Sequence, residues 1–293
     1  MKDKLSLPEL ADRARRGERL VMVTAYDAPS ARLADEAGVD IVLVGDSAGT
    51  TVMGLDSTVP VTMDDMLVFT RAVARGTRRA LVVADMPLGS YQVSEEDAVA
   101  NAVRFAKAGA DAVKLEGGGR TLGRISSIVD AGIAVMGHVG LLPQSAIKLG
   151  GYRAQGRTAS AAQPLVDDAV GLERAGCFSI VIEAVPPVVA ARITAAVKVP
   201  TIGIGAGASC SGQVLVWHDL LGLGAGPVPR FVKQFGDAGA VIREALGRFA
   251  DEVRAGTFPA SEHTYTMPPD EQKQFEAGTG SARPPGPKRV SRP

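Results

Sequence analysis

Residues 81–116 read LVVADMPLGSYQVSEEDAVANAVRFAKAGADAVKLE, and this stretch decides the fold. Apolar runs at 81–84 and 112–115 flank an Ala-rich segment, Glu95–Ala108, whose apolar residues recur at helical spacing. Gly109 follows the segment, where glycine suits the left-handed conformation that ends many helices. A strand, a helix and a second strand joined by short turns predict a βαβ unit with parallel strands.

The same alternation continues on both sides of this unit. We expect strands near 21–26, 41–46, 81–86, 112–116, 134–138, 179–183, 201–205 and 214–218. Helical patterns lie between them at Ser30–Ala37, Met63–Arg75, Glu95–Ala108, Arg120–Asp130, Pro164–Ala175 and Pro187–Val197, and glycines follow five of them at Gly38, Gly76, Gly109, Gly132 and Gly176. Eight strands in about 250 residues are typical of an α/β fold of the TIM type, the (βα)8 barrel. A doubly wound open sheet is the alternative, but its nucleotide-binding glycines are missing after the first strand.

Composition and charge favour a soluble enzyme over a nucleic-acid or membrane protein. The chain has 293 residues, and 32 Lys+Arg balance 32 Asp+Glu, so no net charge favours nucleic acid or an anionic membrane. Cys177 and Cys210 make no disulfide framework, and no close Cys/His cluster predicts zinc. No apolar run reaches membrane-spanning length, and Met1–Glu18 is too charged for a secretory signal, so we expect a cytoplasmic protein.

The C-terminal segment differs in composition from the rest of the chain. From residue 267 it reads MPPDEQKQFEAGTGSARPPGPKRVSRP, which is rich in Pro, Gly and charge. Such a segment buries too little apolar surface to offset the entropy lost on ordering. We therefore expect a catalytic barrel domain over residues 1–266 and a disordered tail over residues 267–293.

Three acidic residues, Asp46, Asp85 and Glu116, each come directly after an apolar run in the first half of the chain. Because the carboxyl ends of barrel strands meet at one face, we expect their side chains to converge. Converging buried carboxylates repel one another, and a hard cation such as Mg²⁺ or Mn²⁺ removes that penalty. Any one of them would simply begin a loop, but the shared position favours a metal site.

Three further polar residues stand at strand ends. Lys114 lies two residues before Glu116, so both side chains point the same way, which suits anion binding or a structural ion pair. His138 ends the fifth apolar run, either as a site residue or as a hydrogen-bonded core residue. Glu183 ends the sixth, where a carboxylate between apolar neighbours suits a general base. The alternative for Glu183 is a carboxylate that only pairs with Lys114 or His138.

A series of short motifs in a fixed order resembles the ketopantoate hydroxymethyltransferase family. The motifs are Thr24-Ala25-Tyr26-Asp27, Val44-Gly45-Asp46-Ser47, Gly54-Leu55-Asp56-Ser57-Thr58, Pro60-Val61-Thr62, Ala84-Asp85-Met86-Pro87, Val113-Lys114-Leu115-Glu116-Gly117-Gly118, Gly137-His138-Val139-Gly140-Leu141, Pro143-Gln144-Ser145, Gly150-Gly151-Tyr152, Gln155-Gly156-Arg157 and Gly203-Ile204-Gly205-Ala206-Gly207. The resemblance runs from about residue 5 to about residue 265. Leu142 and Ser211 depart from the family pattern, but neither is at a metal or base position.

The resemblance implies a (βα)8 barrel of the phosphoenolpyruvate/pyruvate type and a homo-oligomer, usually a decamer. It implies transfer of a one-carbon unit from 5,10-methylenetetrahydrofolate to 3-methyl-2-oxobutanoate, which gives 2-dehydropantoate in pantothenate synthesis through a Mg²⁺-stabilised enolate. By motif, Asp46, Asp85 and Glu116 match the Mg²⁺ positions, and Ser47, Asp85 and Lys114 match the keto-acid contacts. Glu183 matches the proton acceptor, and we add Asp46 and His138 to the expected substrate contacts.

Two other functions fit parts of this pattern. One is another Mg²⁺-dependent enolate-forming lyase or mutase on the same barrel, which would turn over without folate. The other is a barrel kept as a binding or scaffold protein, which predicts the loss of a metal or base residue. All of those residues are present in this chain.

Overall fold

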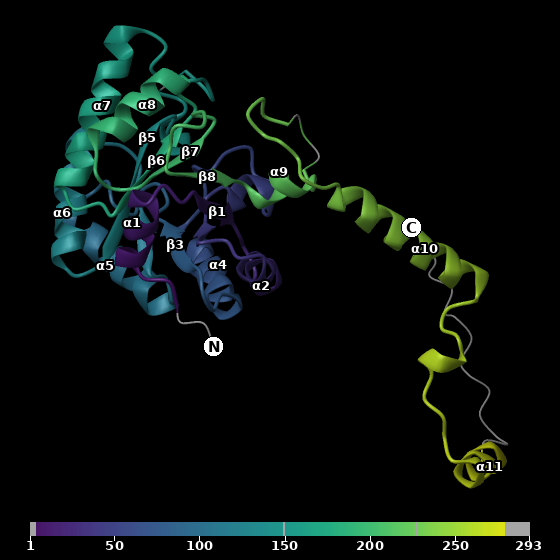
Figure 1. The fold of residues 1–293 in the computed structure, drawn as a ribbon. Helices are drawn as coiled ribbons and strands as arrows, with labels where there is room; N and C mark the ends of the chain where they lie inside the picture. The colour runs from purple at the N-terminus through teal and green to yellow at the C-terminus, as the bar shows by residue number, and fades with distance from the viewer. Residues whose placement is uncertain (1–3, 149, 225, 227, 279–293) are drawn as a thin grey trace, which may run out of the picture. The chain divides into compact units, whose positions relative to one another are not determined.

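The strands form a closed parallel barrel (Figure 1). The computed structural model describes residues 4–148, 150–224, 226 and 228–278. The strands are β1 (Leu20–Thr24), β2 (Ile41–Val44), β3 (Leu81–Asp85), β4 (Ala112–Lys114), β5 (Ala134–Gly140), β6 (Ser179–Glu183), β7 (Thr201–Ile204) and β8 (Gly212–Leu215). They follow one another in chain order around the barrel, and β8 pairs with β1 to close it. The closed ring confirms the predicted (βα)8 barrel over the open sheet.

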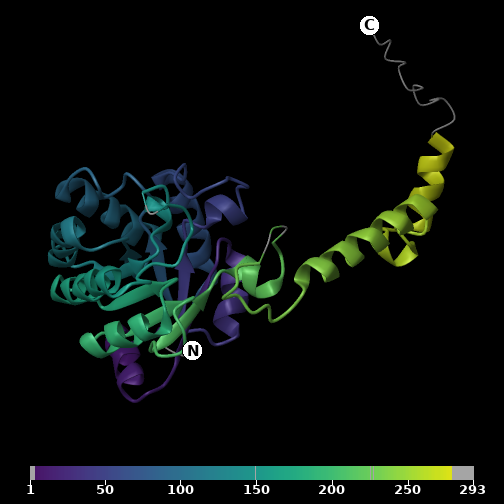
Figure 2. The ribbon, with the colours of Figure 1, turned by 90° about the horizontal axis from the view of Figure 1, so that it is seen from above.

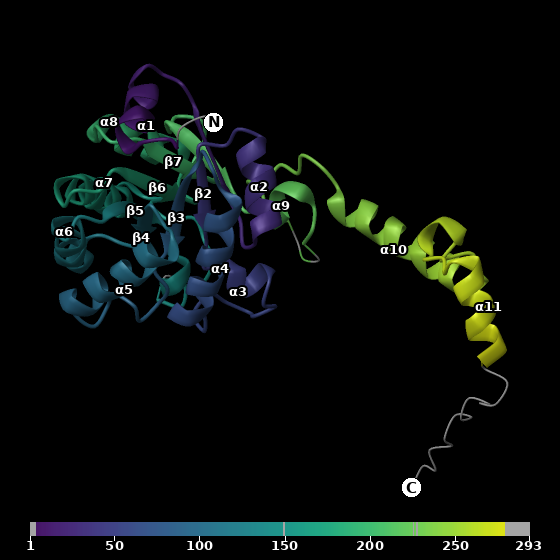
Figure 3. The same cartoon turned by 90° about the horizontal axis from the view of Figure 1, so that it is seen from below.

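Helices cover the outside of this barrel (Figures 1, 2 and 3). They are α1 (Leu7–Arg15), α2 (Ala28–Glu36), α3 (Ala48–Thr51), α4 (Met63–Gly76), α5 (Glu95–Ala108), α6 (Leu122–Asp130), α7 (Ala159–Arg174), α8 (Pro187–Ala196) and α9 (Trp217–Leu221), with single 3₁₀ turns η1 (Gly119–Thr121) and η2 (Pro143–Ser145). Helices α4 to α7 each pack on strands, and neighbouring helices α2 and α4, α5 and α6, and α7 and α8 pack on each other.

Two apolar layers hold the barrel together. Inside the ring, side chains such as Met22, Leu81 and Met136 fill the barrel, which is therefore a packed core rather than a pore. Outside it, residues such as Val82 and Phe105 form the larger layer between strands and helices. Strands β2 and β3 are buried on both faces, which explains why their sequences are continuous apolar runs instead of alternating ones.

Local chemistry fixes where the helices begin. The side chains of Asp27, Thr62, Ser94 and Thr158 each accept a hydrogen bond from the backbone N–H three residues on, which satisfies a donor that has no partner inside the helix. Thr158 explains one difference from the sequence prediction, because α7 begins at Ala159 and Pro164 lies inside the helix instead of at its start.

Four of the five glycines expected at helix ends have the left-handed conformation, namely Gly38, Gly109, Gly132 and Gly176. Gly76 is different, because it is the last residue of α4 and packs against the start of α2. A Cβ there would lie 2.3 Å from the carbonyl oxygen of Ala28, so this glycine permits a close approach of two helices.

The connection from β7 to β8 differs from all the others in the barrel. It runs from Gly205 to Ser211 without a helix among its residues, all of which are described. Strand β8 also ends at Leu215, earlier than predicted, and Trp217 begins the short helix α9. The outer side of β8 is consequently open, and Gln213 is exposed there.

The chain divides by its internal contacts into Met1–Gly239 and Ala240–Pro293. Beyond the first unit lie most of α10 (Ala238–Ala255), a 3₁₀ turn η3 (Ser261–His263) and α11 (Pro269–Gly278). This division differs from the expected boundary at residue 266, and α11 lies where the composition predicts disorder. Pro269 at the first helical position, with Asp270 and Glu271 in the first turn, suits a helix start. Residues 279–293 of the expected tail lie outside the described residues.

Candidate active site

The three acidic residues after β2, β3 and β4 lie together at the carboxyl end of the barrel. Asp85 is the last residue of β3, and Asp46 and Glu116 each lie two residues beyond their strands. Asp46 is 5% exposed, Asp85 is 4% exposed and Glu116 is 7% exposed, so all three residues are buried. Strands β2, β3 and β4 are neighbours, which brings these side chains to one place as the sequence predicts.

Each of these carboxylates has one oxygen bonded to an N–H group. Asp85 Oδ2 accepts from the backbone N–H of Asp46 at 3.0 Å, and Asp46 Oδ2 accepts from Gln144 Nε2 at 2.9 Å. Glu116 Oε2 accepts from the backbone N–H of Gln144 at 3.1 Å. The remaining Asp85 oxygen, Oδ1, is buried and has no hydrogen-bond donor in the described part of the chain. One oxygen of each carboxylate is thus fixed by the protein.

Lys114 is the cation of this cluster. Its Nζ lies 2.8 Å from Asp85 Oδ1, a close ion pair that does not meet hydrogen-bond geometry. Burial lowers the pKa of Lys114, but the carboxylates of Asp85, Glu116 and Asp46 outweigh that effect and raise its pKa. Lys114 is therefore charged at neutral pH, and both it and Glu116 point into the site as strand alternation predicts.

His138 connects Lys114 to Glu183. His138 Nδ1 lies 3.5 Å from Lys114 Nζ, and His138 Nε2 lies 3.2 Å from Glu183 Oε2 without meeting hydrogen-bond geometry. An ammonium group only donates, so Nδ1 accepts and the proton of neutral His138 sits on Nε2, which faces the carboxylate. Burial, followed by the charge of Lys114, lowers the pKa of His138, which keeps the ring neutral.

Excess negative charge dominates the electrostatics. Burial, followed by repulsion from Asp85, raises the pKa of Asp46 to about 7. Burial also raises the pKa of Glu116, and the nearby Lys114 offsets this only in part. Four carboxylates with Glu183, against the single ammonium of Lys114, leave a local surplus of negative charge that favours a bound cation.

Tyr26 and Ser47 form a polar pair beside the acids. Tyr26 Oη lies 2.8 Å from Ser47 Oγ, and burial raises the pKa of Tyr26, so its hydroxyl stays protonated. The sequence predicts Ser47 as a substrate contact, but it does not predict the contact between Tyr26 and Ser47. The quoted motif Thr24-Ala25-Tyr26-Asp27 was the available signal, but only the fold shows that it meets the loop after β2.

The backbone around Glu183 is held in an unusual conformation. Ala184 has φ +47°, a left-handed value that costs a residue with a Cβ about 1–2 kcal/mol. Gly140 has φ +100°, and a Cβ there would lie 2.1 Å from the carbonyl oxygen of Glu183. The same carbonyl accepts a hydrogen bond from Leu141 at 2.9 Å, so the end of β5 fixes the position of Glu183.

The donor set fits a magnesium ion. Mg²⁺ commonly binds one or two protein carboxylates and keeps several waters. Among residues 4–148, 150–224, 226 and 228–278, no three His, Cys, Asp or Glu side chains form a group that could hold one ion by themselves. Asp85 Oδ1 is buried without a hydrogen bond, and the backbone N–H of Asp46 bonds to the other Asp85 oxygen, which agrees with a site of few protein ligands.

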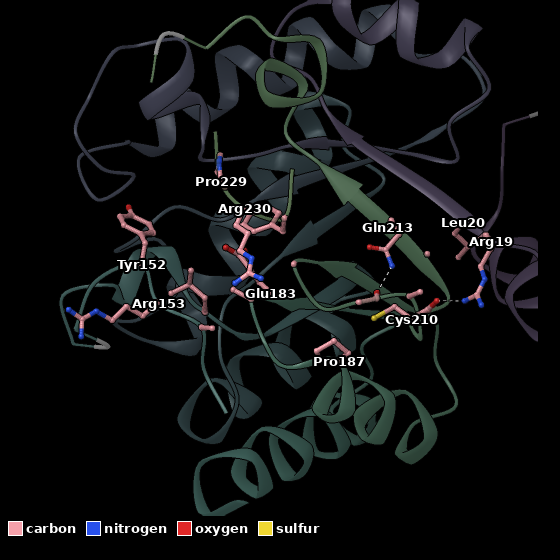
Figure 4. A pocket seen from close by; sticks show the side chains of 18 of the residues that line it. Arg19, Leu20, Tyr152, Arg153, Glu183, Pro187, Cys210, Gln213, Pro229 and Arg230 are labelled. Atoms are coloured by element: carbon pink, nitrogen blue, oxygen red, sulfur yellow. Dashed lines mark hydrogen bonds between the residues drawn. The ribbon is translucent and has the colours of Figure 1, made fainter. Parts of the chain in front are cut away.

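A groove of about 1300 Å³ adjoins the site at Glu183 (Figure 4). Tyr152 and Arg153 line one side, and Cys210 and Gln213 line the other, over the loop that joins β7 to β8. The groove reaches Glu183 but includes none of the three acids after β2, β3 and β4. Its walls are mainly apolar, so it provides volume beside the charged cluster and not a second charged site.

Among the described residues, no helix is both long enough and apolar enough to cross a membrane.

A closed parallel barrel with buried acids and a lysine at the carboxyl ends of its strands defines an enzyme of the (βα)8-barrel class. A family model described as ketopantoate hydroxymethyltransferase matches residues 4–261, and the chain belongs to that family. A relative from Heliobacterium modesticaldum, named 3-methyl-2-oxobutanoate hydroxymethyltransferase, is 54% identical over 274 residues, which cover 93% of this chain and 99% of the relative. These matches confirm the resemblance seen in the motifs.

Solved structures with the same architecture are more distant in sequence. A phosphonopyruvate hydrolase in complex with oxalate and Mg²⁺ is 16% identical with a TM-score of 0.56, over 94% of this chain and 98% of that one. A 2,3-dimethylmalate lyase, described as a PEP mutase/isocitrate lyase superfamily member, is 15% identical with a TM-score of 0.55, over 94% and 99%. At this identity the likeness shows the fold alone, and it agrees with the expected barrel type.

Proposed function

We propose that this chain is a hydroxymethyltransferase that converts 3-methyl-2-oxobutanoate to 2-dehydropantoate in pantothenate synthesis. The observation that carries the proposal is the convergence of Asp46, Asp85, Glu116 and Glu183 on Lys114 and His138 at the barrel face. Membership of the ketopantoate hydroxymethyltransferase family supports the reaction. The proposed donor of the one-carbon unit is 5,10-methylenetetrahydrofolate, as the motif resemblance implies.

The site residues divide into a binding group and a proton-transfer group. Asp46, Asp85 and Glu116 would hold Mg²⁺ together with bound water and the substrate. Asp46, Ser47 and Lys114, with Asp85, would bind the keto acid. When bound, Mg²⁺ withdraws electron density from the keto oxygen and so makes the C3 proton more acidic. The Lys114 ammonium places a fixed positive charge near the oxygen where negative charge develops.

Glu183 is the general base. It removes the C3 proton, and the electron pair left on C3 forms the bond to the methylene carbon as one of that carbon's two bonds to folate nitrogens breaks. Water then displaces the second folate nitrogen from the same carbon and supplies the hydroxyl oxygen of the product. One nitrogen takes up the C3 proton and the other takes up a proton of the water. The Nε2–H of His138 faces the Glu183 carboxylate at 3.2 Å and helps to orient the base. Cys177 and Cys210 take no part, because both thiols are buried and burial raises their pKa values.

The enzyme is a homo-oligomer, and the decamer of the resemblance is our expectation for its size. Exposed apolar side chains support association, among them Val241, Leu246 and Phe249 on α10, which are 67%, 62% and 53% exposed. A cytoplasmic location stays a prediction from the sequence. Sedimentation of the purified protein tests the assembly, and a monomer at working concentration would contradict it.

One assay tests the activity directly. The purified protein is incubated with the keto acid, with and without methylenetetrahydrofolate and with and without Mg²⁺, and the hydroxymethylated product is measured. We expect product only when all components are present. Consumption of a keto acid without folate would instead identify another enolate-forming enzyme on this barrel.

A further inference from the structure

Gln144 occupies a special place among the carboxylates. It lies in the turn η2 after β5, is 8% exposed, and contacts two of the three acids at once. Its side-chain Nε2 donates to Asp46 Oδ2, and its backbone N–H donates to Glu116 Oε2. Two of the three N–H groups that fix the acids therefore belong to a single residue.

The orientation of the Gln144 amide is determined by its neighbours. The backbone N–H of Glu116 donates to Tyr91 Oη at 3.2 Å, so the single hydroxyl proton of Tyr91 points elsewhere. It points to Gln144 Oε1 at 2.9 Å, which turns the amide nitrogen toward Asp46 Oδ2 and the carbonyl of Met86, each at 2.9 Å. Both amide protons and the amide oxygen are thus bonded within a buried network.

Resting on the proposed function, we propose that Gln144 is a positioning residue that presents Asp46 and Glu116 to the cation with one fixed oxygen each. A carboxylate that is hydrogen-bonded through one oxygen presents the other oxygen to an ion in a defined direction. The side chain therefore does not have to change its orientation when the ion binds. Tyr91 acts one step further out, because it sets the direction of the Gln144 amide. Donors that orient ligand carboxylates typically contribute about 10–100-fold in metal affinity.

Gln144→Met tests the contact with Asp46, because it keeps the length of the side chain and removes the side chain's hydrogen bonds. The backbone N–H of residue 144 keeps its bond to Glu116 in this variant. The measurement is Mn²⁺ binding to the purified protein without substrates, followed by electron paramagnetic resonance of the free ion. We expect the dissociation constant to rise about 10–100-fold. We also expect kcat to recover to within about threefold of wild type at saturating metal, because Asp46, Asp85 and Glu183 are intact and the loss is one of metal affinity.

A matched control is available in Gln163, whose Nε2 donates to Asp167 Oδ1 at 2.8 Å on the exposed face of α7. Gln163→Met removes the same type of bond from a surface carboxylate and should leave Mn²⁺ affinity unchanged. Thermal unfolding of the metal-free variants shows whether Gln144→Met is folded. If it is not, Tyr91→Phe replaces it, since this change removes only the hydroxyl that orients the amide, and we expect a smaller loss of Mn²⁺ affinity, at least about threefold.

The outcomes separate the inference from the proposed function. If the wild-type protein binds no Mn²⁺, or if Asp85→Ala binds it as tightly as wild type, the metal site itself is wrong. If wild type binds Mn²⁺ and folded Gln144→Met, or Tyr91→Phe in its place, binds it with a dissociation constant within twofold of wild type, the Gln144 side chain does not position Asp46 and the inference is overturned. A rise in the dissociation constant with recovery of kcat at high metal supports positioning.

Discussion

Acidic residues at the two ends of the barrel have the same chemistry and different surroundings. At the amino ends, Asp40 precedes β2 and Asp111 precedes β4. Asp40 accepts a hydrogen bond from the backbone N–H of Val21 at 2.9 Å and pairs with Arg13 at 2.5 Å. Asp111 accepts from the neighbouring strand at 2.7 Å and pairs with Lys4 at 2.7 Å. Each of these two acids has at least one cation beside it, and Asp40 has a second in Arg79 at 3.6 Å, although Arg13 also pairs with the exposed Glu18.

At the carboxyl ends, Asp46, Asp85 and Glu116 share Lys114. Asp40 is 2% exposed and Asp46 is 5% exposed, so burial alone does not distinguish the two ends. What differs is the balance of charge, which is complete at the amino ends and deficient in cations at the carboxyl ends. A buried acid therefore indicates function only when its partners have been counted.

The largest expected effect comes from removing one acid of the deficient end. Asp85→Ala should abolish turnover, with a loss of at least about 10³-fold, because it removes an expected ligand of the cation and a partner of Lys114. The fold should persist, because the carboxylates of Glu116 and Asp46 remain beside Lys114. Steady-state assays over a range of Mg²⁺ concentrations measure the loss, and full activity at ordinary Mg²⁺ would remove Asp85 from the site.

A second change separates the base from the metal ligands. Glu183→Gln keeps the shape of the side chain and removes one charge, so Mn²⁺ binding should stay close to wild type. Exchange of the C3 proton of 3-methyl-2-oxobutanoate with solvent deuterium should fall roughly 10²–10⁴-fold, the usual contribution of a general base. Proton NMR follows the exchange. Exchange at the wild-type rate would exclude Glu183 as the base and make His138 the next candidate.

The balanced end should respond in the opposite way. Asp40→Ala should cost about 3 kcal/mol of unfolding free energy, because it leaves Arg13 without its buried partner and the N–H of Val21 without an acceptor. Turnover at 25 °C should be unchanged. Urea unfolding measures the stability, with Asp12→Ala as the control, since Asp12 pairs with Arg15 on the exposed surface and should cost less than about 1 kcal/mol. A loss of activity with unchanged stability would contradict the contrast.

The smallest effect is a dependence on pH. Asp46 has a pKa raised from 3.8 to about 7 in the metal-free protein, so its contribution to stability is present below about pH 4 and is lost as the pH rises through 7. The metal-free melting temperature should fall between pH 5 and pH 8, a range chosen around that pKa of about 7. Saturating Mg²⁺ should flatten this slope, because the cation replaces the proton. Asp46→Asn should remove the same part of the slope, and an unchanged slope in that variant would assign it to other groups.

Much of the fold could be predicted because each element carries its own local signal. Strands β2, β3, β4 and β6 are apolar runs that end in or near an acid, and α5 was predicted with the bounds that the structure gives. Helix α7 begins at Ala159, before the predicted start at Pro164, because Thr158 provides the cap. The helices after residue 237 have no predicted counterpart, although the apolar residues of α10 recur at helical spacing.

The site was predictable to the extent that it lies at strand ends. Asp46, Asp85, Lys114, Glu116 and Glu183 lie at or just beyond the ends of their strands, and His138 lies two residues before the end of β5, so topology brings them together. Gln144 and Tyr91 lie in loops after β5 and β3, and their meeting depends on how two loops pack. Such a contact leaves no periodic pattern in the sequence. A short motif gives the residue types at its positions, but it does not show which other residues they contact.

Closure of the ring has a consequence for how quickly the enzyme is made. Strand β1 pairs with β8, and the partners Leu20 and Gly212 belong to opposite ends of the barrel sequence. Pairing across such a separation is entropically slow, so the last seam forms late in folding. Until then the edges of β1 and β8 expose unpaired backbone groups that can join another chain. Refolding yield should therefore depend steeply on protein concentration, even though every residue proposed for the chemistry lies between β2 and β6.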